Sequence, residues 1–234
     1  ALEVDLEGPL ADLAARLAAM DPERLAEPPP DLDAVLRPYQ QRGLAWLTEM
    51  ADLGVGGVLA DDMGLGKTIQ VLALHLARRS HGRPTLVVCP ASVLANWERE
   101  TARFAPGVPT RRFHGPGRDL EGLAPDEIVV ATYGVVRRDV EALAGVGWGL
   151  VVADEAQAVK NPNARTARAL RRIRGDARFA LTGTPVENRL TELWAILDVV
   201  NPGLLGSEHR FRTQWAQPIE RDGNVEVAAR LRRL

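Results

Sequence analysis

Short apolar runs recur along this chain, and stretches with helix-like patterning separate them. The runs lie at residues 57–60, 85–89, 127–131, 150–153 and 178–181. Continuous apolar runs of four or five residues are typical of strands buried on both faces of a parallel sheet. The segments between them place apolar residues every three to four positions, as amphipathic helices do. Among them, residues 135–144 and 190–200 each predict one helix, and residues 161–163 predict a turn. This alternation predicts an α/β fold with a doubly wound, mainly parallel sheet and helices on both faces.

The two ends of the chain depart from this pattern. Residues 9–20 carry apolar side chains at helical spacing, and the prolines at 28–30 predict a stiff, extended linker. We therefore expect residues 1–35 to form an N-terminal helix and linker, and residues 36–205 to form the compact lobe. Apolar residues recur in residues 206–234, which predict a further packed segment.

Composition narrows the class of protein. Apolar residues make up 46% of the 234 residues, which is enough for a full core. No apolar run approaches the ~18 residues of a membrane span, and the N-terminus lacks a signal pattern, so we expect a cytoplasmic protein without membrane contact. The single cysteine, Cys89, excludes an internal disulfide and a cysteine-based zinc site. With a net charge of −2, the chain as a whole lacks the positive charge that is typical of nucleic-acid-binding proteins.

The first apolar run leads into a glycine-bearing turn and then a helical pattern, at residues 61–68 (DDMGLGKT). Gly64 and Gly66 lack side chains, so backbone N–H groups can close around phosphate oxygens. Lys67 can reach the β- and γ-phosphates, and Thr68 can offer a hydroxyl to Mg²⁺. We interpret the turn as a phosphate-binding loop, although Asp61 stands where the general pattern has a glycine. The alternative is a glycine-rich turn with a chance Lys-Thr pair.

Two carboxylates, Asp154 and Glu155, follow the fourth apolar run directly. Acidic side chains at the end of a buried strand are costly unless they are paired or bound to a metal. This edge of an open α/β sheet is also where ligands bind. We expect Asp154 to hold Mg²⁺ together with Thr68, and Glu155 to orient and deprotonate water. With Lys67, these residues form a candidate site for phosphoryl transfer to water; a surface acidic turn is the alternative.

Other polar residues stand at strand ends and helix starts. Thr182 and Thr184 can hydrogen-bond to Gln157 and so couple the hydrolytic site to a neighbouring loop, or they can form a local turn. The Gln40 amide can both donate and accept, as recognition of an adenine edge requires. Candidates for contact with a phosphodiester backbone are Ser92, Asn96, Thr132 and Tyr133. The alternative is that these four residues serve as helix caps.

Taken together, these segments resemble the first RecA-like lobe of the Swi/Snf-related ATPases of helicase superfamily two, and we expect a bacterial member. The resemblance covers roughly residues 35–220. Its motifs are residues 36–47 (LRPYQQRGLAWL), 60–68 (ADDMGLGKT), 86–100 (LVVCPASVLANWERE), 131–134 (ATYG), 152–161 (VADEAQAVKN) and 181–205 (LTGTPVENRLTELWAILDVVNPGLL). Asp61, unusual in a general phosphate loop, fits the start of the family's motif.

The resemblance implies an ATP-driven, Mg²⁺-dependent translocase on double-stranded DNA that remodels DNA–protein complexes. It assigns Gln40 to adenine and Lys160, with the segments around Ser92 and Thr132, to the DNA backbone. The residues it assigns to the nucleotide are Asp62, Met63, Gly64, Leu65, Gly66, Lys67 and Thr68.

It also implies a second RecA-like lobe with an arginine finger, to which residues 206–234 begin the connector. Without that lobe, we expect this chain to hydrolyse ATP hardly at all. A location in the cytoplasm, at the nucleoid, follows from the same resemblance. An RNA-directed superfamily-two lobe remains an alternative, as does a non-motor module that binds nucleotide or docks another protein.

Overall fold

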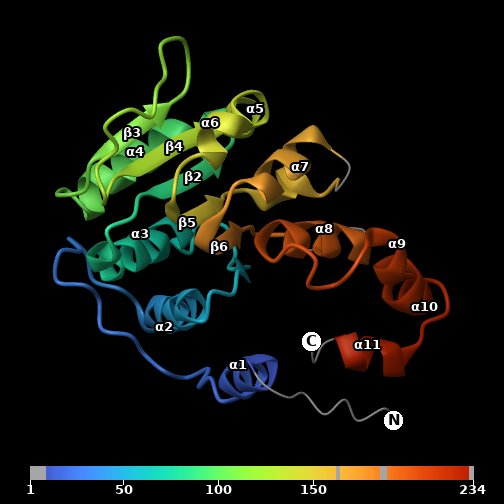
Figure 1. Ribbon diagram of the computed structural model, residues 1–234. Helices are drawn as coiled ribbons and strands as arrows, with labels where there is room; N and C mark the ends of the chain where they lie inside the picture. Colours follow the sequence, from blue (N-terminus) through green and yellow to red (C-terminus); the bar gives the residue numbers. More distant parts are fainter. Residues whose placement is uncertain (1–8, 162–163, 185–188, 232–234) are drawn as a thin grey trace.

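A parallel sheet of six strands forms the centre of the molecule (Figure 1). The structure is a computed structural model that describes residues 9–161, 164–184 and 189–231. The strands are β1 (Gly57–Leu59), β2 (Thr85–Cys89), β3 (Thr110–Phe113), β4 (Ile128–Thr132), β5 (Trp148–Ala153) and β6 (Gly175–Leu181). Their order is β1-β6-β5-β2-β4-β3, and each described pair is parallel. The expected parallel α/β sheet is therefore confirmed.

Strand order decides which loops meet. Because all pairs are parallel, the carboxyl ends of the strands lie along one edge of the sheet. Leu59, the last residue of β1, pairs with Leu181, and Ala153, the last residue of β5, pairs with Ala180. The segments after β1 and β5 therefore emerge at the same edge, on either side of β6.

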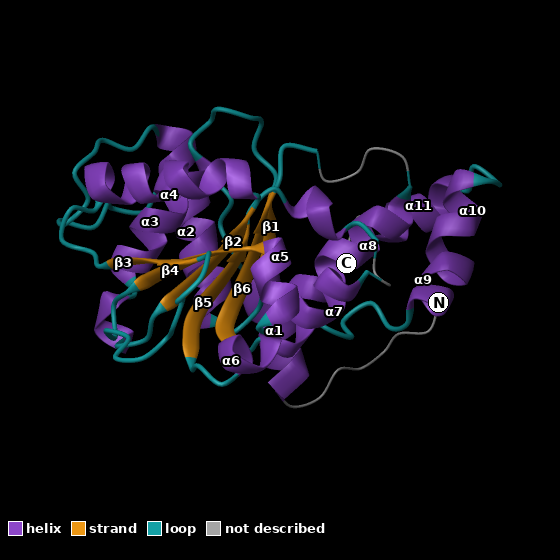
Figure 2. Cartoon of the chain, turned by 90° about the horizontal axis from the view of Figure 1, so that it is seen from above, coloured by secondary structure: helices purple, strands orange, loops and turns teal. Residues whose placement is uncertain are grey.

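Helices cover both faces of the sheet (Figure 2). One face carries α2 (Pro38–Asp52), α3 (Lys67–Ala77) and α4 (Ala91–Phe104). The other carries α5 (Tyr133–Arg138), α6 (Val140–Ala144), α7 (Arg165–Arg172) and α8 (Leu190–Val200). Along β2, Val87 and Cys89 join the first core, whereas Leu86 and Val88 join the second. A strand packed on both sides needs a continuous apolar run, which is the pattern the sequence has.

Two helical predictions are corrected by the structure. The pattern at residues 135–144 suggested one helix, but α5 and α6 are separate, and the break falls at Asp139. The Asp139 carboxylate accepts hydrogen bonds from the Arg118 guanidinium at 2.8 and 3.0 Å. Ser92 is not a helix cap: Pro90 precedes the first turn of α4, and Ser92 lies exposed within that turn. The turn expected at residues 161–163 falls partly outside the described residues.

The chain ends pack at the β1 side of the sheet. Helix α1 (Pro9–Ala18) precedes the extended linker. After α8, the chain forms α9 (Glu208–Phe211), a π-helical turn (Arg212–Ala216), α10 (Gln217–Glu220) and α11 (Val225–Leu231). Phe211 is buried against α8, as the pattern of apolar residues predicted. Among the described helices, none is long and apolar enough to cross a membrane.

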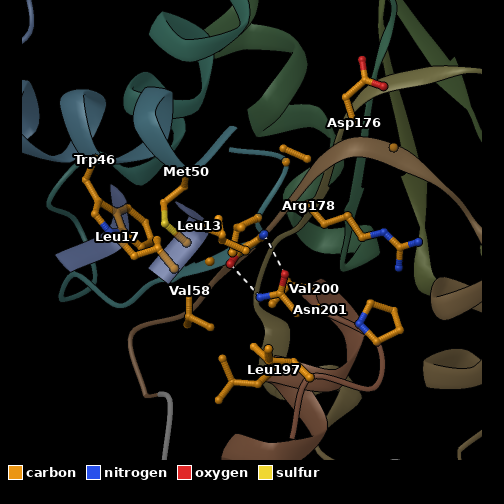
Figure 3. A pocket seen from close by; sticks show the side chains of 18 of the residues that line it. Leu13, Leu17, Trp46, Met50, Val58, Asp176, Arg178, Leu197, Val200 and Asn201 are labelled. Atoms are coloured by element: carbon orange, nitrogen blue, oxygen red, sulfur yellow. Dashed lines mark hydrogen bonds between the residues drawn. The ribbon is translucent and has the colours of Figure 1, made fainter. Parts of the chain in front are cut away.

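A cavity of about 1010 Å³ lies beside β1, between α1, α2 and α8 (Figure 3). Its walls are largely apolar, with Leu17, Trp46 and Leu197 among them. At its rim the Asn201 amide forms two hydrogen bonds with the backbone of Gly56, at 2.7 and 2.8 Å. These bonds join the residue before β1 to the residue that follows α8. None of the predicted site residues lines this cavity.

Candidate nucleotide-binding site

The turn after β1 has the backbone geometry that a phosphate loop needs. Gly64 and Gly66 adopt φ values of +83° and +77°, in the left-handed region that favours glycine. A Cβ at Gly66 would also lie 2.5 Å from the Gln40 amide nitrogen. Helix α3 begins at Lys67, so its free N–H groups face the turn.

Lys67 is held within this turn. Its ammonium donates hydrogen bonds to the backbone carbonyls of Asp61, at 2.8 Å, and Asp62, at 3.1 Å. An ammonium has three N–H donors, so one remains for a phosphate oxygen. Thr68 follows, half-buried, in the first turn of α3.

Asp61, the departure from the general phosphate-loop pattern, has a structural explanation. Its carboxylate accepts a hydrogen bond of 2.8 Å from the Gln70 amide, which is fully buried on α3. A glycine could not tie the start of the loop to the helix in this way. Sequence reasoning did not find Gln70, because a single glutamine one turn into a helix has no distinguishing pattern.

Gln40 packs against the opposite side of the loop. Its amide nitrogen donates to the carbonyl of Leu65 at 3.1 Å, and its oxygen accepts from the N–H of Arg37 at 2.9 Å. The Tyr39 hydroxyl donates to the same Leu65 carbonyl at 3.1 Å. Tyr39, Gln40 and the loop glycines line a cavity of about 490 Å³. The predicted adenine-binding residue and the predicted phosphate loop thus line the same cavity. Tyr39 also lines it, and the sequence pattern did not identify Tyr39 as a site residue.

Asp154 lies at the carboxyl end of β5 and is only 7% exposed. One carboxylate oxygen accepts a 2.8 Å hydrogen bond from the Trp97 indole, and the other accepts from the N–H of Glu155 at 2.9 Å. Burial raises the pKa of Asp154, while the Trp97 hydrogen bond and the positive charge of Lys67 act in the opposite direction. Lys67 is thus among the charges that favour the ionised form of Asp154, and the two residues follow strands on either side of β6.

Glu155 is the single non-glycine residue with positive φ in the described part of the chain, at 51°. Its carboxylate accepts a 2.6 Å hydrogen bond from the Gln157 amide. The Gln157 oxygen in turn accepts from the Thr182 hydroxyl at 3.1 Å. The predicted Thr182–Gln157 hydrogen bond is thus present. Thr184 donates its N–H to the Thr182 hydroxyl at 3.1 Å, which is the local-turn geometry.

Comparison with known proteins identifies the family of this chain. A family profile described as SNF2-related domain matches residues 39–234. The chain belongs to the SNF2-related family. A Bacillus subtilis protein named as an ATP-dependent helicase/translocase, YwqA, is 40% identical over 243 residues. The match covers 100% of this chain and 26% of YwqA.

Two further SNF2-related proteins show how far the likeness extends. The TATA-binding protein-associated factor mot1 of Aspergillus fumigatus is 36% identical over 209 residues, which cover 82% of this chain and 11% of that protein. The SWI2/SNF2 ATPase core of Sulfolobus solfataricus, solved in complex with dsDNA, has a TM-score of 0.82 and 42% identity. That match covers 89% of this chain and 44% of the Sulfolobus chain, and it agrees with the expected RecA-like fold. The SNF2-related chain thus spans about a quarter of the length of YwqA.

The predicted DNA contacts of this SNF2-related chain lie in different environments. Ser92 is exposed at the start of α4. The Asn96 amide nitrogen donates a hydrogen bond to the Glu100 carboxylate, and its oxygen accepts one from the Arg99 guanidinium, both at 2.9 Å. Lys160 forms an ion pair of 3.4 Å with Glu192.

Thr132 and Tyr133 turn inward at the carboxyl end of β4. Thr132 is buried, with its hydroxyl 3.3 Å from His114, and the Tyr133 hydroxyl donates to the carbonyl of Asp154 at 2.6 Å. Their hydroxyls are therefore engaged inside the protein. A contact with a phosphate at this point remains a prediction for the backbone N–H groups at the start of α5.

Proposed function

We propose that this chain is the ATP-binding and ATP-hydrolysing lobe of a double-stranded-DNA translocase that remodels DNA–protein complexes. The observation that carries the proposal is the convergence of Lys67 and the Asp154–Glu155 pair on one sheet edge, on either side of β6. Membership of the SNF2-related family supports it. Two properties of similar proteins also support it: YwqA is named as an ATP-dependent helicase/translocase, and the Sulfolobus ATPase core was solved in complex with dsDNA.

Each residue of the site has a distinct part in the proposed reaction. Lys67 and the backbone N–H groups at Gly64 and Gly66 neutralise and orient the phosphates. Glu155 accepts the proton of the attacking water as the water oxygen bonds to the γ-phosphorus and the bond from that phosphorus to the β-phosphate oxygen breaks, with ADP as the leaving group. Gln40 recognises the adenine edge.

The donors present fit Mg²⁺. This ion binds through one or two carboxylates plus phosphate oxygens and water, rather than through an all-protein cage. Thr68 and Asp154 offer one hydroxyl and one oriented carboxylate at the same sheet edge. When bound there, Mg²⁺ supplies positive charge to the phosphate oxygens.

We propose that a second RecA-like lobe supplies an arginine finger, a group worth about 10³–10⁵ in rate in related phosphoryl-transfer enzymes. The isolated chain should then turn over far more slowly than the ~1 s⁻¹ at the low end of ordinary enzymes. A cytoplasmic location at the nucleoid and an unidentified DNA-bound protein target belong to the same proposal.

The test of the hydrolytic role is Glu155→Gln in a protein that joins this chain to a second lobe. We expect turnover to fall by about 10²–10⁴-fold, because the general base is lost, while ATP binding persists. Glu49→Gln, on α2 and away from the site, is the matched control. Unchanged turnover in Glu155→Gln would favour a non-motor module that binds nucleotide.

The nucleic-acid partner is tested separately in the same two-lobed protein. Backbone contacts alone do not separate DNA from RNA, which differ here in the 2′-hydroxyl. We expect duplex DNA to stimulate ATP hydrolysis and duplex RNA of the same sequence to have little effect. Stronger stimulation by RNA would support the RNA-directed alternative.

A further inference from the structure

Trp97 has a polar contact that its place in the core does not explain. It lies on α4 with 0% of its surface exposed, and its apolar ring packs among the residues that cover the sheet. A phenylalanine would serve such packing. The indole N–H needs a hydrogen-bond partner when it is buried, and here that partner is the Asp154 carboxylate at 2.8 Å.

Tyr133, on α5, contacts the same residue from the other face of the sheet. Its hydroxyl donates to the Asp154 carbonyl at 2.6 Å. With the N–H of Glu155 on the second carboxylate oxygen, three donors hold Asp154, and two of them come from α4 and α5. Each carboxylate oxygen accepts one of these bonds and keeps a lone pair for a metal.

We propose that Trp97 and Tyr133 are positioning residues that connect α4 and α5 to the magnesium-binding carboxylate. The inference rests on the proposed function. The amino end of α4 carries Ser92, and the backbone N–H groups at the start of α5 follow Thr132; these are the predicted contacts with the DNA backbone. Phosphate docking at those ends is thereby transmitted to Asp154.

The distances along the chain suit such a connection. Trp97 lies five residues after Ser92 on one continuous helix, about 7.5 Å along its axis. Tyr133 is the first residue of α5 and directly follows Thr132. Since a helix moves as a rigid body, a shift at Ser92 displaces the indole that orients the carboxylate. Partners that orient a metal ligand typically change metal affinity or activity by about 10–100-fold when they are lost.

The test compares Trp97→Phe with Trp148→Phe. Trp148 is also buried, and its indole donates to the Leu143 carbonyl at 2.7 Å, so the control loses the same ring atoms and the same kind of hydrogen bond. The readout is the Mg²⁺ concentration at half-maximal binding of a non-hydrolysable ATP analogue, measured by calorimetry on this chain.

We expect Trp97→Phe to raise that concentration by about 10–100-fold while analogue binding without Mg²⁺ stays constant. Trp148→Phe should leave the Mg²⁺ dependence as in the wild type. Equal Mg²⁺ dependence in the two variants overturns the positioning role. If Trp97→Phe does not fold, Tyr133→Phe, which removes only a hydroxyl, undergoes the same titration with the same expected direction.

The connection to DNA is tested with Tyr133→Phe in a two-lobed protein. We expect the stimulation of hydrolysis by duplex DNA to fall several-fold, while the dissociation constant for DNA stays within a factor of about two. Unchanged stimulation, or a loss of DNA affinity that accounts for the whole effect, contradicts the proposal. Absence of stimulation in the wild type instead overturns the proposed function, and the Mg²⁺ titration still decides the positioning role.

Discussion

At the scale of single residues, Glu155 combines a predicted chemical role with an unfavourable backbone. Its φ of 51° brings its N–H to the Asp154 carboxylate and its own carboxylate to Gln157. A non-glycine residue in this conformation costs about 1–2 kcal/mol. Such strain often accompanies function, because selection for stability alone would remove it.

This strain gives a stability prediction. Glu155→Gly and Glu155→Ala both remove the carboxylate and its hydrogen bond to Gln157, but only glycine relieves the backbone. We expect the glycine variant to have the higher free energy of unfolding, by about 1 kcal/mol, in chemical denaturation. If the alanine variant were equally stable, the strain would have to be absent.

His75 links stability to pH. It is buried on α3, with its ring nitrogens 2.8 Å from the Thr85 hydroxyl and 3.1 Å from the Asp126 carbonyl. Burial lowers its pKa from 6.5 to about 4. Between these two pH values the unfolded chain binds more protons than the folded chain, so stability falls as the pH falls.

The His75 contribution should be fully present above pH 6.5 and lost as the pH approaches 4. We expect a loss of up to about 3 kcal/mol in the free energy of unfolding over this window. The measurement is chemical denaturation of wild type and His75→Gln at several pH values. The stability difference between them should shrink in acid, and a constant difference would show that His75 does not titrate in this way.

At the scale of elements, Gly43 on α2 leaves room for the buried Gln70 side chain of α3. A Cβ at this position would lie 1.8 Å from the Gln70 side-chain oxygen, and that buried amide also holds Asp61 of the phosphate loop. The missing side chain therefore leaves the Gln70 amide in the place where it ties the phosphate loop to α3.

Gly43→Ala should lower the free energy of unfolding by about 1–3 kcal/mol, although alanine is the better helix former. Gly134→Ala is the matched control, because Gly134 is also helical and its added Cβ would meet nothing within 4 Å. We expect the control to gain up to about 1 kcal/mol. Equal effects in thermal or chemical unfolding would exclude the clash.

The elements themselves were largely predictable from the sequence. β2 and α8 have the bounds that their apolar patterns indicated, because strands and helices packed on a core leave a strong periodicity. The division at Asp139 was missed because no proline or glycine marks it, and the Arg118 that binds the Asp139 carboxylate lies 21 residues away in the chain. Trp97 and Gln70 were also missed as parts of the site. Trp97 binds Asp154, 57 residues away, and Gln70 binds Asp61, 9 residues away, so no local spacing marks either contact.

At the scale of the whole molecule, the account depends on strand order. β1 and β5 are far apart in sequence, and only the placement of β6 between them brings the phosphate loop and the acidic pair to one edge. The motifs alone predicted a nucleotide site, but not which strand separates its two halves. The large apolar cavity beside β1 lies apart from this edge and plays no part in the proposed chemistry.

The most direct measurement is calorimetric binding of Mg·ATP analogue to this chain, with and without EDTA, for wild type, Lys67→Ala and Asp154→Asn. If both residues face one nucleotide, Mg²⁺ should strengthen binding in the wild type, and Lys67→Ala should weaken binding with or without the metal. Asp154→Asn should bind the metal-free analogue normally and lose the strengthening by Mg²⁺. Normal Mg²⁺-dependent binding in both variants would contradict the account.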